Sequence, residues 1–227
     1  SPLDCMGCGE CITVCPTAAI SMQPQESQSA EQPVFDYLVA NVSKKTDAGM
    51  VDTTPKGSQF NQPLLEFSGS CAGCAETSYA RLITQLFGEQ MFISNATGCS
   101  SIYGASAPST PYSIPWANSL FEDNAEFGLG IKQGINIKRN KIKKYMEENK
   151  CDLFDKWLEN MNDYNTCLEV LNEIDFDKHK ELEQLKDYIV PKSMWIIGGD
   201  GFAYDIGFGG LDHVLSTTEN INILILD

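Results

Sequence analysis

The sequence predicts an α/β protein in which a parallel sheet is preceded by a small cysteine-rich module. Short apolar runs that fit buried strands alternate with longer helical patterns, and strands separated by helices favour parallel pairing. The cysteine-rich module is predicted by four cysteines within the first fifteen residues. The strand candidates are residues 64–67, 91–95, 194–197 and 221–226.

The helical patterns come in chain order between these strands. Residues 78–87 carry apolar side chains at helical spacing, and Gly88 fits a C-terminal cap. A loop rich in Gly, Ser and Pro covers 98–118 and precedes a helix over about 121–148. A Gly-rich helix over 203–215 joins the last two strands.

A charged helical insertion interrupts this alternation at about 138–192. Within it, Leu153, Phe154, Trp157 and Leu158 form one apolar stripe, for which packing is the default interpretation. Cys151 and Cys167 lie in the same insertion, and we expect both to be unligated thiols.

Three segments follow from this organisation. Residues 1–22 form the cysteine-dense module, which closes with a short apolar strand at 19–22. Residues 23–62 are polar and read as a linker or an arm. Residues 63–227 form the sheet domain, and because the chain stops at the carboxyl end of a strand, where ligands bind in open sheets, we expect this domain to be truncated.

Composition narrows the class of protein. With 42% hydrophobic and 21% charged residues, global disorder is not expected. The net charge of −15 repels a phosphate backbone, so nucleic acid is a poor candidate partner. The sequence has no apolar run of about eighteen residues and no secretory signal at its start, so we expect a cytoplasmic protein, with a hydrogenosome-like organelle as the other option.

The first cysteine group has the spacing Cys5-x2-Cys8-x2-Cys11-x3-Cys15-Pro16. In bacterial ferredoxins the first three thiolates of such a run hold one [4Fe–4S] cube, and the fourth binds the other cube of a two-cluster module. The alternative is a structural zinc knot, which usually pairs two knuckles across a longer gap or adds histidine. Since only one run is present, we interpret residues 1–22 as half of a two-cluster module.

A second group consists of Cys71, Cys74 and Cys99. A Cys-x-x-Cys before a helix is also the thioredoxin-like dithiol motif, because a helix N-terminus lowers the thiol pKa. The third cysteine, which follows a predicted strand, favours an iron–sulfur cluster that lacks one ligand.

Gly199-Asp200-Gly201 follows a buried strand and opens a helix. Glycines allow backbone amides to approach a diphosphate, and the carboxylate can hold a divalent cation that bridges its oxygens. Taken alone the triplet is weak, since an ordinary structural turn has the same composition.

In combination, these motifs resemble the pyruvate:ferredoxin (flavodoxin) oxidoreductase family over essentially the whole chain. The strings that carry the resemblance are Cys5 to Pro16, Lys56 to Phe60, Leu65 to Cys74, Asn95 to Gly104, Asn118 to Gly128 and Gly199 to Gly207.

The resemblance implies a role for each matching residue. Cys71, Cys74 and Cys99 correspond to three ligands of the cluster nearest the thiamine diphosphate. Glu76 corresponds to a contact of that cofactor. Gly199, Asp200, Gly201 and Phe202 correspond to the diphosphate and magnesium loop, with Asp200 on Mg²⁺.

The resemblance also implies a reaction: thiamine-dependent oxidative decarboxylation of pyruvate with coenzyme A to acetyl-CoA and CO2. Electrons would leave through [4Fe–4S] clusters to ferredoxin or flavodoxin, in an enzyme that is a homodimer at full length. Because the family's other substrate-binding parts have no match here, no catalytic residue is assigned and we expect the isolated chain to be inactive. The alternatives are the core of a pyruvate:NADP oxidoreductase fused to a flavin reductase, and a non-enzymatic metal-binding electron-transfer module.

Overall fold

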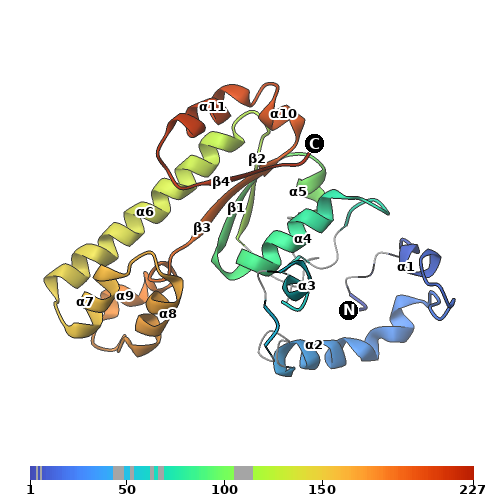
Figure 1. Ribbon diagram of the computed structural model, residues 1–227, viewed down its shortest axis with the longest axis horizontal. Coiled ribbons are helices and arrows are strands. Elements are labelled where there is room, and N and C mark those ends of the chain that lie inside the picture. The colour runs from blue at the N-terminus through green and yellow to red at the C-terminus, as the bar shows by residue number, and fades with distance from the viewer. Residues whose placement is uncertain are drawn as a thin grey trace. The chain divides into compact units, whose positions relative to one another are not determined.

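The computed structural model describes residues 1–3, 5, 7–42, 49–51, 54–61, 64–65, 69–104 and 115–227. The chain divides into two compact units. The first contains Ser1–Glu89, Thr97–Asn118 and Leu226, and the second contains Gln90–Ala96, Ser119–Ile225 and Asp227. Figure 1 shows the elements in chain order. The three segments expected from the sequence, with boundaries at residues 22 and 62, were defined by cofactor binding, and these boundaries stay predictions.

The sheet confirms the predicted fold class. β1 (Met91–Ala96) pairs in parallel with β3 (Ser193–Gly198), and β3 pairs in parallel with β4 (Asn222–Ile225). The register places Asn95 beside Ile197, so the two strands end at the same edge. β1 and β3 are almost fully buried, as their apolar sequences predict.

Two expectations about strands were wrong. The predicted loop over 98–118 overlaps a strand, β2 (Trp116–Ser119). This strand completes the sheet order β2-β1-β3-β4, and its last residue belongs to the second unit. Residues 19–22 form no strand, because no described segment supplies a pairing edge for them. Of the strand predicted at 64–67, Leu64 and Leu65 form a bend, and Glu66 and Phe67 lie outside the described residues.

One face of the sheet is covered by α6 (Asn124–Glu148), against which α11 (Phe208–Ser216) packs (Figure 1). Helix α6 comes close because of Gly128: a Cβ there would lie 2.5 Å from Ile196 Cγ1. The core between these layers includes Met194, Ile196 and Phe202. The predicted helix at about 121–148 is confirmed. The helix predicted at 203–215 is confirmed only from Phe208 onward, as α11, because residues 204–207 form turns between α10 (Asp200–Ala203) and α11.

Asn124 joins the first turn of α6 to the strands. Its Oδ1 accepts hydrogen bonds from Ser94 Oγ at 2.6 Å and from Ser119 Oγ at 3.1 Å. Its Nδ2 donates to the Ile197 carbonyl at 3.0 Å. The side chain is fully buried, so this one amide fixes where α6 meets β1 and β3.

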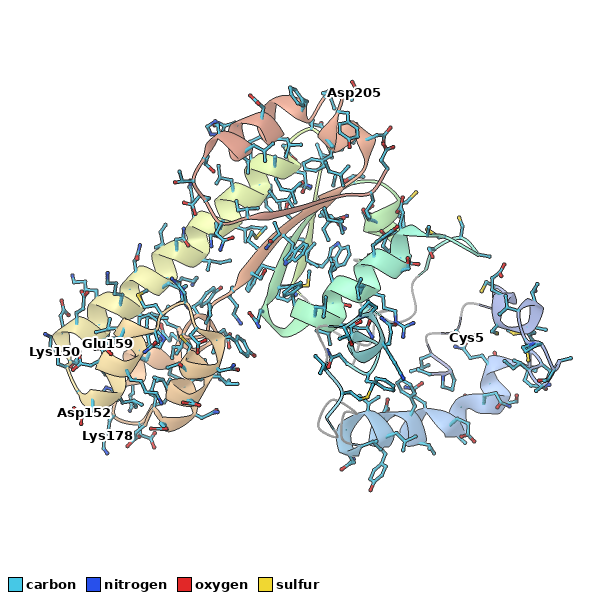
Figure 2. All side chains as sticks on the ribbon, viewed as in Figure 1. Cys5, Lys150, Asp152, Glu159, Lys178 and Asp205 are labelled. Carbon is cyan, nitrogen blue, oxygen red and sulfur yellow. The ribbon has the colours of Figure 1, made fainter. Side chains whose placement is uncertain are left out.

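The predicted helical insertion is a subdomain at the far end of α6. It comprises α7 (Asp152–Glu159), α8 (Tyr164–Glu173), α9 (Lys180–Glu183) and the 3-10 turn η4 (Lys186–Tyr188). Phe154 and Trp157 are buried in its core, which confirms the packing interpretation. Lys150, Asp152, Glu159 and Lys178 lie at the outer end of this subdomain (Figure 2).

The buried Arg139 fastens this subdomain to α6. Its guanidinium donates to the carbonyls of Met161, Tyr188 and Ile189 and lies over the Trp157 ring, 5.3 Å from the centroid. The Trp157 indole also donates to the Ile189 carbonyl, at 2.9 Å. Burial lowers the pKa of Arg139.

The first unit consists mainly of short helices. Its longest element, α4 (Glu76–Phe87), is capped by Gly88, as predicted, and the 3-10 turn η3 (Gly88–Gln90) follows. The other elements are α1 (Glu10–Thr13), η1 (Gln25–Glu31), α2 (Gln32–Asn41), α3 (Pro55–Ser58) and α5 (Cys99–Gly104). A small core contains Leu65, Ala80 and Tyr103, with Trp116 packed against it.

None of the described helices is long and apolar enough to cross a membrane.

Candidate functional site

Two of the four cysteines in the N-terminal run line a cavity. Gly7 and Gly9 adopt left-handed backbone angles, with φ of 73° and 78°, which coil the chain tightly before α1. The cavity measures about 540 Å³, and Cys5 and Cys11 line it together with the apolar side chains of Ile20 and Met22. Figure 2 marks Cys5 in this module. Polar side chains, including Gln25 and Glu31, complete the lining, and a concave site with two thiols and backbone from a Gly-rich loop fits an iron–sulfur cluster.

Cys15 has different surroundings. Ala18 takes a left-handed φ of 51°, and the Ala19 backbone N–H donates to Cys15 Sγ at 3.3 Å. This hydrogen bond, followed by those from Thr17, lowers the pKa of the Cys15 thiol. Cys15 is not among the residues that line the cavity, and neither is Cys8. The assignment of Cys15 to a different cube stays a prediction.

The second cysteine group lies in the same unit. Gly73, with φ of 73°, turns the chain between Cys71 and Cys74, and the Cys74 N–H donates to the Cys71 carbonyl at 3.1 Å. Cys74 is half-buried, whereas Cys71 and Cys99 are exposed. Cys99 is the first residue of α5, three residues after β1 ends.

Glu76 and Tyr103 lie beside these cysteines. Glu76 is the first residue of α4 and is half-buried. Burial raises the pKa of Tyr103, and the negative charge of Glu76 raises it further, with smaller contributions from the Cys74 and Cys99 thiolates. The buried Tyr103 phenol therefore lies within electrostatic range of two predicted cluster ligands, Cys74 and Cys99, and of Glu76, the predicted cofactor contact.

Within the described part of the chain, no three Cys, His, Asp or Glu side chains converge closely enough to hold a single metal ion. A [4Fe–4S] cube distributes its four thiolates over four iron atoms, so its ligands need not meet at one point. The ligand sets proposed from the sequence therefore stay predictions.

The Gly199-Asp200-Gly201 turn lies where β3 ends. A Cβ at Gly198 would lie 2.8 Å from Ala96 Cβ, so the ends of β1 and β3 are in close contact. The Asp200 carboxylate is exposed in the first turn of α10. At Gly201 a Cβ would meet only Phe121, at 3.6 Å, so packing does not require glycine there and the backbone is open to a bound group.

Phe202 is the exception among the predicted cofactor residues. Its side chain is buried in the core of the second unit, with 1% exposed. A contribution from Phe202 to a cofactor site would therefore come from its backbone.

Two residues with specific contacts were not singled out from the sequence. Tyr103 follows Cys99 by one helical turn, and this spacing was the available signal. Asn124 lies in one of the family strings, but nothing in the sequence identifies its partners Ser94, Ser119 and Ile197.

Comparisons with known proteins agree with the cysteine motif. Residues 1–21 match the family model of the 4Fe-4S binding domain. Over its full length the chain is 50% identical to a pyruvate-flavodoxin oxidoreductase of Klebsiella pneumoniae, covering 21% of that protein. It is 44% identical to a pyruvate:ferredoxin oxidoreductase of Moorella thermoacetica and covers 22% of it.

An NADP-linked relative is also similar. The chain is 42% identical over its full length to a pyruvate dehydrogenase (NADP+) of Cryptosporidium parvum, of which it covers 15%. The chain therefore spans about a fifth or less of the length of these curated relatives.

Proposed function

We propose that this chain, a homologue of one segment of the pyruvate oxidoreductases, contributes cluster ligands and a diphosphate–magnesium turn to a thiamine-dependent enzyme. The observation that carries the proposal is the exposed Asp200 directly after the buried strand β3, at the edge where parallel sheets bind ligands. The full-length similarity supports the same assignment.

The proposed reaction oxidises a 2-oxoacid. Pyruvate and coenzyme A give acetyl-CoA and CO2, and one proton and two electrons are released. Thiamine diphosphate, when bound, would supply the nucleophilic carbon and the electron sink for the loss of CO2. The [4Fe–4S] clusters, which cysteines of this chain would help to hold, would supply one-electron carriers toward ferredoxin or flavodoxin.

The residues of this chain have distinct proposed roles. Asp200 would hold Mg²⁺, and the backbone of Gly199 and Gly201, of which Gly201 has open space beside it, would accept the diphosphate. Glu76 would contact the cofactor from the start of α4. Cys71, Cys74 and Cys99 would hold the nearby cluster, whereas Cys5, Cys8, Cys11 and Cys15 would serve the ferredoxin-type clusters.

Asp200→Asn in the anaerobically prepared full-length protein tests the proposal. Loss of the charge should weaken magnesium-dependent thiamine diphosphate binding at least tenfold, while iron content stays unchanged. Asp205→Asn is the matched control, because Asp205 is exposed and lies only five residues further along (Figure 2). Equal cofactor affinity in Asp200→Asn and the unsubstituted protein would refute the assignment of Asp200.

A second candidate is an NADP-linked pyruvate oxidoreductase, favoured by the similarity to the Cryptosporidium protein. The two candidates share the chemistry at pyruvate and differ in the acceptor. Pyruvate-dependent reduction of NADP+ by the full-length protein, without added ferredoxin or flavodoxin, would select the second candidate.

The remaining parts of the proposal concern the protein's setting. We propose a homodimer in the cytoplasm or in another reducing compartment, where the nine cysteines stay free of disulfides. The isolated chain should show no coenzyme-A-dependent oxidation of pyruvate. A purely electron-carrying or zinc-binding module would instead contain metal but bind no thiamine diphosphate.

A further inference from the structure

We propose that Tyr103 is a positioning residue, whose buried hydroxyl donates a hydrogen bond to the Glu76 carboxylate and holds it toward the thiamine diphosphate. The inference rests on the proposed function and adds to it a residue to which neither the motifs nor the comparisons give a role.

The placement of Tyr103 is the first argument. It lies on α5 one helical turn after Cys99, and its ring packs against Leu65 and Ala80. Ala80 follows Glu76 by one turn of α4, so Tyr103 contacts the helix face that also carries Glu76. Ala80 lies in the second turn of α4, so Tyr103 packs near the N-terminal end of that helix, where Glu76 lies.

The hydroxyl itself is the second argument. Tyr103 is only 2% exposed, and within the described part of the chain its Oη has no hydrogen-bond partner at 3.5 Å or less. A buried hydroxyl without a partner destabilises the fold, so a nearby acceptor is expected to engage it. Glu76 is within electrostatic range, and its charge helps to keep Tyr103 protonated and therefore able to donate.

The third argument is that the ring is held in place. A Cβ at Gly104 would lie 2.2 Å from Trp116 Cζ2, so the indole packs directly on the residue that follows Tyr103. Trp116 packs against the small core that Tyr103 forms with Leu65 and Ala80. A side chain with a restricted rotamer can orient a flexible carboxylate at little entropic cost.

A double-mutant cycle in the anaerobic full-length protein tests the inference. The variants are Tyr103→Phe, Glu76→Ala and the combination, and the control is Tyr79→Phe, which removes a hydroxyl from an exposed tyrosine on α4. The readouts are the Kd for thiamine diphosphate with Mg²⁺, the iron content and the melting temperature.

The expected result is that Tyr103→Phe raises the Kd about tenfold, as for the loss of one charge-assisted hydrogen bond. Glu76→Ala should raise it at least as much, and the combined variant should bind no more weakly than Glu76→Ala alone, because Tyr103 acts through Glu76. Tyr79→Phe should bind normally, and iron content should stay constant throughout.

Four results would overturn the inference. Normal affinity in Tyr103→Phe, or multiplicative losses in the combined variant, would show that Tyr103 does not act through Glu76. Loss of iron in Tyr103→Phe would assign it to the cluster fold instead. If the unsubstituted protein binds no thiamine diphosphate while Asp200→Asn is equally inert, the proposed function fails together with the inference.

Discussion

Asn124 shows how a single buried amide can fix the geometry of a sheet edge. Replacing it by Ala would remove the side-chain donor to the Ile197 carbonyl and would leave Ser94 Oγ only the backbone carbonyl of residue 124 as acceptor. We expect Asn124→Ala to destabilise the second unit by about 2–4 kcal/mol, since a stranded buried group costs about 1–3 kcal/mol and each lost hydrogen bond about 0.5–1.5 kcal/mol.

Amide hydrogen exchange in the full-length protein measures this locally. Some β1 and β3 amides exchange only when the second unit opens. These amides should exchange at least about 30-fold faster in Asn124→Ala than in the unsubstituted protein. Asn136→Ala is the matched control, because Asn136 makes one partly buried hydrogen bond, to Glu219 Oε2. Equal protection of the strands in the two variants would contradict the role given to Asn124.

Cys167 should behave as an inert structural thiol. Burial raises its pKa above the ordinary value, although nearby Arg139 opposes this, and its Sγ lies 3.4 Å from the Met161 carbonyl. The folded state therefore binds the Cys167 thiol proton more tightly than the unfolded state does. The stability that this protonated thiol contributes is complete below the pKa of Cys167 in the unfolded state, and it is lost as the pH rises through the higher pKa of the folded state.

Alkylation followed by mass spectrometry checks this expectation. At pH 8, the exposed Cys151 should react rapidly, whereas Cys167 should stay unmodified until the insertion unfolds. Comparable rates at the two thiols under native conditions would show that the insertion core is open.

At the scale of residues, the spacing of cysteines in the sequence identifies candidate ligands, but it does not identify contacts between residues that are far apart in the chain. The cysteines and Asp200 stand out because their chemistry is local: a tight loop or a turn after a strand is visible in the sequence. Tyr103 and Asn124 gain their contacts from segments far along the chain, such as Ala80 and Ile197. No periodicity encodes those pairs.

Two of the three glycines in helix α6 have opposite expected effects. Gly128 allows close approach to the sheet, so Gly128→Ala should destabilise the second unit by about 1–3 kcal/mol through overpacking against Ile196. At Gly134 a Cβ meets nothing within 4 Å. Gly134→Ala should stabilise the helix by about 0.5–1 kcal/mol.

Exchange of the α6 amides, compared between these two variants, tests the pair. The prediction is faster exchange in Gly128→Ala and slower exchange in Gly134→Ala. The same sign of change in both variants would contradict the close packing of α6 on β1 and β3.

At the scale of elements, segments with a nearly continuous apolar pattern or a long helical pattern were predictable, and short polar segments were not. β1, β3 and α6 follow from such patterns in the sequence. β2 is four residues long and includes Asn118 and Ser119, so its sequence alone resembles a loop. It becomes a strand because an edge is available for pairing.

The insertion depends on Arg139 more than on its surface ion pairs. Arg139→Met should remove hydrogen bonds to three carbonyls and destabilise α7 to α9 by about 3–5 kcal/mol, because buried acceptors lose their only charged donor. Limited proteolysis within residues 150–190 should accelerate strongly. Lys144→Met, which removes an exposed i,i+4 pair, should leave cleavage unchanged.

At the scale of the whole molecule, the sequence predicts two sites of different completeness. Cys5 and Cys11 of the ferredoxin-type run line a cavity, and residues 1–21 match a cluster-binding family. The Cys71, Cys74 and Cys99 set and the Asp200 turn rest on similarity to a segment of larger proteins.

The central claim is that Cys71, Cys74 and Cys99 hold a cluster of their own, and metal analysis tests it most directly. Iron and acid-labile sulfide are measured in the anaerobic full-length protein and in Cys99→Ser, with Cys151→Ser as the control. We predict that Cys99→Ser loses about four iron and four sulfide per chain, one [4Fe–4S] cube, and that Cys151→Ser loses none. Unchanged iron in Cys99→Ser, or zinc without labile sulfide in the unsubstituted protein, would contradict the claim.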